Sequence, residues 1–184
     1  MKKNQLFLLS ASLLLLGFTA LKAQKKPVEN HVKKILYFNP EVEPNLEEIK
    51  EPTNNAFFDA VSEKISTRRN RLLRTETQMP YDSIDAQTIM EYGKNNDADF
   101  IVVPKIKYFK VGIGKYVFSN QVLVSMKVFD AKGNLVTSSQ YDTYRKNMRL
   151  LGSTENSVKI GTNGAMKTIF QELKRLKPLS ENTF

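Results

Sequence analysis

The feature that most constrains the fold is a regular alternation of apolar and polar residues in the second half of this 184-residue chain. Residues 100–103 begin the strongest apolar run, and residues 116–128 continue with a period of two, which is the period of a half-buried strand. Glycine-containing turn sequences interrupt the pattern at 112–115 and 130–134. Residues 135–144 are polar but rich in Thr and Tyr, as in an edge strand. We therefore expect three strands joined by tight turns.

The other segments alternate between strand-like and helix-like patterns. In chain order we expect a strand at 35–38, an acidic, proline-broken loop at 39–55, a helix at 56–67, a strand around 72–73, a helix that Asp82 or Ser83 caps and that ends near Gly93, and a last helix at 156–177. This βαβα order followed by a β-meander predicts a single α+β or α/β domain over 34–178. Its mixed sheet has about five strands with helices packed on it, and 179–184 form a tail.

The apolar positions also predict which residues meet in the core. Eight side chains are expected to pack between the sheet and the helices: Phe57, Val61, Phe100, Val102, Val124, Val128, Ile169 and Leu173.

The first 23 residues have the three parts of a secretory signal peptide. Two lysines give a positive start, residues 6–21 form an uncharged, mostly apolar stretch of 16 residues, and Ala23 provides a small residue at the cut. Sixteen residues fall short of the roughly 20 that a spanning helix needs, which favours cleavage over the alternative of an uncleaved membrane anchor. No cysteine follows the stretch, so a lipid-modified amino terminus is excluded. We expect a periplasmic protein whose residues 24–33 form a flexible leader; the end of the signal sequence resembles those common in the Bacteroidetes.

The composition excludes several kinds of site. The chain has no cysteine and a single histidine, His31, which removes disulfides, thiol nucleophiles, zinc fingers and iron–sulfur centres. His31 lies in the expected leader, where a general base would lack a fixed geometry. We expect no cofactor, no metal ion and no enzymatic activity.

Two motifs carry a resemblance to a known domain. Ala98 and Asp99 precede an apolar strand that follows the second helix, and Asp130 and Gly133 form a hairpin that is followed by two apolar residues. Over about residues 34–177 the chain resembles the α/β domain shared by the TolB amino-terminal domain, the curli-secretion lipoprotein CsgG and the penicillin-binding-protein activator LpoB. The resemblance implies that fold and an envelope-assembly or interaction role, and it brings no catalytic residues. The chain lacks the lipidation cysteine, so anchoring as in CsgG or LpoB is not expected.

Basic residues gather in two segments of the chain, which carries a net charge of +9. The two groups are Lys105, Lys107, Lys110 and Lys115 around the first expected hairpin, and Arg68, Arg69, Arg71 and Arg74 between a helix end and a strand start. Solvated charge explains both, because arginine complements a helix carboxyl end and lysine hinders edge pairing. The alternative is a surface for an envelope protein or an anionic envelope component, such as peptidoglycan or lipid head groups. Export argues against a nucleic-acid partner, and no transmembrane span is expected in the mature form.

Two functions remain open from the sequence. The first is an exported, periplasmic, non-enzymatic accessory or interaction protein of the bacterial cell envelope, which binds a partner through a basic or sheet-edge surface. The alternative is a small secreted hydrolase or ligand-binding protein that uses a carboxylate pair. The candidate pairs are Asp82 with Asp85 and Asp97 with Asp99, although such positions beside helix ends are typical of caps and turns.

The signal-peptide interpretation predicts the amino terminus of the exported protein. We expect cleavage after Ala23, so that amino-terminal sequencing of the exported form reads Gln-Lys-Lys-Pro. A sequence that starts at Met1 would instead identify a retained anchor.

Overall fold

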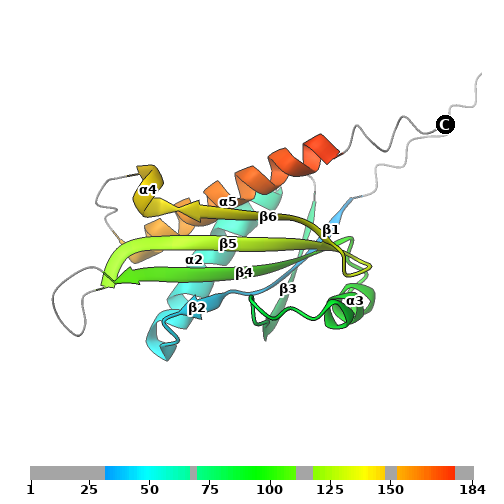
Figure 1. The fold of residues 1–184 in the computed structure, drawn as a ribbon, viewed down its shortest axis with the longest axis horizontal. Helices are drawn as coiled ribbons and strands as arrows, with labels where there is room; N and C mark the ends of the chain where they lie inside the picture. Colours follow the sequence, from blue (N-terminus) through cyan, green and yellow to red (C-terminus); the bar gives the residue numbers. More distant parts are fainter. Residues whose placement is uncertain (1–31, 67–69, 111–117, 148–152, 177–184) are drawn as a thin grey trace, which may run out of the picture. The chain divides into compact units, whose positions relative to one another are not determined.

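The computed structural model describes residues 32–66, 70–110, 118–147 and 153–176. These residues form a single α+β domain with a mixed sheet of six strands and four helices (Figure 1). The elements are β1 (Lys34–Asn39), β2 (Glu41–Glu43), α2 (Glu47–Ser66), β3 (Arg71–Gln78), α3 (Ala86–Asn95), β4 (Phe100–Lys110), β5 (Phe118–Asp130), β6 (Leu135–Asp142), α4 (Thr143–Asn147) and α5 (Thr154–Leu176). The expected signal peptide, most of the leader, the turn at 112–115 and the tail lie outside the described residues.

The sheet has the strand order β3-β1-β4-β5-β6, and β2 pairs with β4 beyond the end of β1. Strands β1 and β3, β1 and β4, and β2 and β4 run parallel, whereas β4, β5 and β6 form an antiparallel meander. The expected fold class is therefore confirmed, with one strand more than the sequence predicted.

Helices α2 and α5 cover one face of the sheet, and this face holds the larger core. All eight predicted core residues belong to it: six are buried, and Phe100 and Leu173 are partly buried at its edge. The period-two pattern of β5 is confirmed as well, because Val122, Val124 and Met126 are fully buried on this same face.

Helix α3 covers part of the opposite face and closes a smaller core. Leu36 and Phe38 of β1 and Ile101 and Val103 of β4 pack there with Ile89 of α3. Strand β1 is thus buried on both faces, which is why it reads as a continuous apolar run rather than an alternating one.

The prediction of a loop over 39–55 is wrong. Pro40 ends β1, but the chain then forms β2 and enters α2 at Glu47, well before the expected start. Pro52 lies inside the helix on its exposed side, where the missing N–H costs least. Glu47 and Glu48 occupy the first turn, where negative charge complements the helix dipole.

Two boundaries in the second half also differ from the prediction. Helix α3 is capped by Asp85, whose carboxylate accepts from the Thr88 backbone N–H at 2.8 Å, and not by Asp82 or Ser83. Strand β6 ends at Asp142, because the buried Thr143 hydroxyl instead bonds the backbone N–H and C=O of Val122. Residues 143–147 then form the short helix α4, which the sequence pattern did not reveal.

The packing of α5 on β6 yields a stability prediction. A Cβ atom on Gly164 would lie 2.5 Å from Cγ of the Tyr141 ring and closer still to two other ring atoms. Gly→Ala at an open helix position stabilises by about 1 kcal/mol, whereas overpacking costs about 1–3 kcal/mol. We expect Gly164→Ala to lower the free energy of unfolding, measured by urea titration; an increase would show that the ring moves freely.

Candidate functional site

One end of the sheet face that carries α3 is left without a covering helix in the described ranges. The apolar cluster beneath α3 reaches Val103 on β4 and Phe129 on β5. Beyond it, residues directly opposite on antiparallel strands share this face and form three cross-strand rows. The rows are Val103–Lys127–Ser138, Lys105–Ser125–Gln140 and Lys107–Leu123–Asp142.

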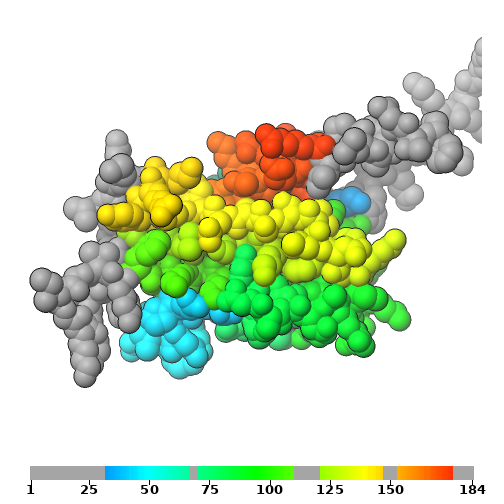
Figure 2. Space-filling view, viewed as in Figure 1, coloured from blue at the N-terminus to red at the C-terminus, as the bar shows by residue number. Residues whose placement is uncertain are grey.

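We call the outer residues of these rows the open sheet face: Lys107, Leu123, Ser138, Gln140 and Asp142. Ser138 and Gln140 are exposed, and the Lys107 side chain is 55% exposed. Figure 2 looks onto this side of the molecule, where the yellow atoms of β6 lie at the surface and the green atoms of α3 lie beside one end.

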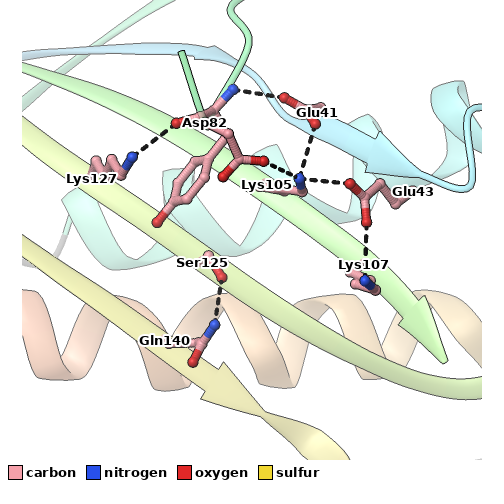
Figure 3. A network of polar contacts seen from close by, with 9 residues as sticks. Glu41, Glu43, Asp82, Lys105, Lys107, Ser125, Lys127 and Gln140 are labelled. Carbon is pink, nitrogen blue, oxygen red and sulfur yellow. Dashed lines mark hydrogen bonds and ion pairs between the residues drawn. The ribbon is translucent and has the colours of Figure 1, made fainter. Parts of the chain in front are cut away.

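Lys105 sits beside the open sheet face at the centre of an ion-pair cluster (Figure 3). Its ammonium group lies 2.6 Å from Glu43 Oε1, 2.8 Å from Asp82 Oδ2 and 3.1 Å from Glu41 Oε1, and its side chain is only 14% exposed. We call these four residues the Lys105 cluster. Glu41 also accepts a hydrogen bond of 2.6 Å from the Tyr81 backbone N–H. One ammonium group therefore joins β2, β4 and the segment before α3.

Strand register explains why the cluster forms. In the parallel pairing of β2 with β4, Glu41 lies beside Lys105 and Glu43 beside Lys107. Glu41 and Glu43 were not predicted as partners of these lysines, because the prolines and charges around them indicated a loop. The available signal was the matching spacing of Glu41-Val42-Glu43 and Lys105-Ile106-Lys107. Every second side chain of a strand points to the same face, so each glutamate of one strand can lie beside a lysine of the other.

The cluster holds Lys105, Glu43 and Asp82 in their charged forms. The hydrogen bond from Lys105 keeps the pKa of Glu43, and likewise that of Asp82, below the usual value. Burial alone would lower the pKa of Lys105, but its hydrogen bonds to Asp82, Glu43 and Glu41 outweigh burial and raise that pKa. None of these three groups is therefore poised to exchange a proton near pH 7, as a general acid or base would need to be.

Ser125 lies opposite Lys105 in the sheet, and a serine beside a lysine invites comparison with a nucleophile and its base. The Ser125 hydroxyl accepts from Gln140 Nε2 at 3.3 Å. Lys105 remains protonated and turned toward its carboxylates, so it cannot take the serine proton. Lys127 donates to the Tyr81 carbonyl at 2.9 Å and lies 4.4 Å from the centre of the Tyr81 ring. These contacts fix side chains; they do not form a proton-transfer chain.

The basic residues singled out from the sequence are dispersed. Lys105 is mostly buried rather than solvated, and Lys107 lies 3.4 Å from Glu43. On β3, the Arg74 guanidinium lies 4.0 Å over the Phe58 ring on the α2 side. Arg71 is exposed and, by strand alternation, faces the opposite side. Neither pair therefore forms one basic surface. The side chains of the remaining four lie outside the described part of the chain: Arg68, Arg69, Lys110 and Lys115.

The candidate carboxylate pairs are engaged separately. Asp85 caps α3 while Asp82 binds Lys105, as described above. Asp97 forms an ion pair with Lys34, and Asp99 accepts from the Lys34 backbone N–H at 2.8 Å. A hollow of about 810 Å³ beside α3 is lined by Asp97 but not by the other three carboxylates. Asp82 and Asp85 thus have different partners, whereas Asp97 and Asp99 both contact Lys34, one at its ammonium group and the other at its backbone N–H.

The described residues contain neither a cluster of metal ligands nor a helix that could cross a membrane. No three His, Asp or Glu side chains gather there as metal ligands. None of the helices described is long and apolar enough to cross a membrane.

No model of a protein family matches the chain, and no curated protein does. Similar solved structures include the PelC dodecamer from Paraburkholderia phytofirmans, with 7% identity, coverage of 73% of this chain and 85% of that one, and a TM-score of 0.48. A homologue of the neuraminyllactose-binding hemagglutinin from Helicobacter pylori has 10% identity, coverage of 82% and 92%, and a TM-score of 0.47. TolB from Acinetobacter baumannii has 11% identity, coverage of 78% and 29%, and a TM-score of 0.36. TolB is thus among the similar structures, but likeness at these values carries no argument about function.

The Lys105 cluster predicts a pH-dependent loss of stability in a variant. Lys105→Met leaves three carboxylates near one another without their cation, and we expect it to lower the free energy of unfolding by about 1–3 kcal/mol at pH 7. The lowered pKa values of Glu43 and Asp82 mean that their stabilisation is present above about pH 4 and is lost as the pH falls through the folded-state values. The difference between wild type and variant should therefore shrink below about pH 4, as urea titrations at several pH values would measure.

Lys107→Met provides the matched control. Lys107 is exposed and has one distant carboxylate partner, so the change should cost less than about 1 kcal/mol at pH 7. Equal losses for the two variants would contradict the central role of Lys105.

Proposed function

We propose that this chain is an exported, non-enzymatic interaction protein of the bacterial cell envelope and that it binds its partner through the open sheet face. The observation that carries the proposal is the end of the sheet that no described helix covers. Helices α2 and α5 bury one face, whereas on the other face the cross-strand rows from Val103 outward present Lys107, Ser138 and Gln140 to the solvent. Side chains that are exposed on a sheet and held by a packed core keep a fixed arrangement, so another protein surface can bind them without first ordering them.

The chemistry of the neighbouring groups supports a binding role over catalysis. Lys105, Glu43 and Asp82 are held charged by one another, and Lys105, the lysine opposite Ser125, cannot take the serine proton. Asp85 and Asp99 serve a helix cap and a strand start. The pKa values of Glu43, Asp82 and Asp85 are lowered and that of Lys105 is raised, so all four shifts lead away from the neutral range in which acid–base catalysis operates.

The charge pattern of the open sheet face favours a protein partner over an anionic polymer. Lys107 pairs with Glu43, and Asp142 pairs with Arg145 at 3.5 Å, so the face carries one charge of each sign and each has an opposite charge beside it. A polymer whose charges all have one sign binds best to a surface of uniformly opposite charge. A surface that carries both signs instead favours a partner whose charges are arranged in the complementary pattern. We therefore favour an envelope protein as the partner.

A charge reversal on the open sheet face tests the proposal. Lys107→Glu places like charges beside Glu43 and inverts one position of the pattern, without burying a new group. We expect the tagged variant to recover much less of a specific envelope protein from a detergent extract than wild type does. Lys167→Glu is the matched control, because Lys167 is an exposed lysine of α5 on the other side of the sheet, and it should recover the wild-type amount.

Two results would count against this function. Equal recovery by the two variants would exclude the open sheet face as the contact. Co-sedimentation of the wild type with purified peptidoglycan or with anionic vesicles, lost at high salt and unaccompanied by any protein, would identify an anionic component instead.

A further inference from the structure

We propose that the outer edge of β6 pairs with β6 of a second copy of this chain, antiparallel and about a twofold axis. Strand β6 pairs with β5 on one side, and in the described residues no strand pairs with its other side. Its backbone N–H and C=O groups on that side are therefore available for a further strand, which is the usual basis of edge-to-edge association.

The side chains of β6 lack the features that normally prevent such pairing. From Leu135 to Tyr141 the strand contains no charged residue and no proline. The other edge strand, β3, carries Arg71, Arg74 and Glu76. Charged side chains on an edge oppose the approach of another strand, so β3 is protected and β6 is not.

Exposed apolar side chains mark the two ends of the same strand. The large hydrophobic side chains exposed among the described residues are Val32, Met90, Leu135 and Tyr144. Leu135 begins β6 and is 55% exposed, while Tyr144 follows its last residue by two positions, is 61% exposed and has its ring 6.3 Å from the Phe109 ring of β4. In Figure 1 these positions correspond to the β5–β6 turn and to α4, at opposite ends of β6.

An antiparallel partner of identical sequence presents the same uncharged strand to β6. A twofold axis through the middle of β6 brings the Leu135 end of one copy to the Tyr144 end of the other, and repeats the contact by symmetry. The uncharged central residues would then face an equally uncharged strand, so no charge is desolvated without a partner. An unrelated protein would need to match both ends by separate means.

Net charge acts against this association and supplies a distinguishing signature. Two chains of net charge +9 repel each other at long range, while the proposed contact contains no ion pair along Leu135–Tyr141. Salt screens the repulsion without weakening the contact. The dimer should therefore become stronger as the ionic strength rises, opposite to an interface held by salt bridges.

The experiment is sedimentation velocity on the full chain over about a hundredfold range of protein concentration. We expect wild type to shift from monomer to dimer as concentration rises, and more so at high salt. Ser138 is exposed and lies near the middle of β6, so Ser138→Lys and Ser138→Glu each place two like charges near the twofold axis. Each variant alone should associate about tenfold or more weakly, and an equimolar mixture of the two should recover the dimer.

Gln78→Lys on β3 is the control, since it adds one positive charge to an exposed position of the other edge strand and should dimerise like wild type. Circular dichroism confirms that each variant is folded. The proposal is overturned if wild type stays monomeric throughout, if the Ser138 variants dimerise normally, or if their mixture does not recover the dimer. None of these results depends on the envelope partner, so this experiment tests the β6 pairing independently of the proposed function.

Discussion

Strand β4 is the element on which the rest of the structure depends, because it is paired with β1 and then β2 on one side and with β5 on the other. One face of β4 remains apolar through Val102, Ile106 and Tyr108 beneath α2 and α5. The other face is apolar at Ile101 and Val103, where α3 covers it, and becomes charged at Lys105. The change of side chain along one face marks the place where helical cover ends. Strand β2 replaces β1 as the neighbour at that place and brings the carboxylates that Lys105 requires.

The sequence predicted the parts of the fold that depend on local patterning. The period of two in β5 identified the buried face correctly, and the eight core residues meet as expected because each belongs to a strand or helix with a strong apolar stripe. The start of α2 could not be predicted in the same way. Pro40 and Pro52 suggested a broken loop, but Pro40 only separates two strands and Pro52 falls on the exposed side of a helix. A proline inside a helix always leaves one carbonyl without its N–H donor, and only the tertiary structure determines whether water can reach that carbonyl.

The candidate site was less predictable, because its decisive contacts join residues far apart in the sequence. Lys105 and Lys107 look like a basic face until β2 is known to lie beside them with Glu41 and Glu43 in register. Arg71 and Arg74 look like a cluster until strand alternation sends them to opposite faces. The net charge of +9 therefore does not translate into a basic contact surface at the described positions. Net charge acts at long range, whereas a contact surface is decided by the local mixture of signs.

The open sheet face and the β6 edge share a strand but use different groups. The face presents side chains of Ser138 and Gln140 in rows with β5 and β4, whereas the edge presents the backbone. Pairing of two β6 edges would leave the side chains of the face in place and set two such faces next to each other in one continuous sheet. A partner that offers two contact segments would then bind both copies, and the second contact would form at the high effective concentration set by the first. The affinity of a weak interaction at a small, mixed-charge face would thereby increase without any new kind of contact. An edge strand without protective charges would in that case contribute to binding, because it allows the two copies to pair.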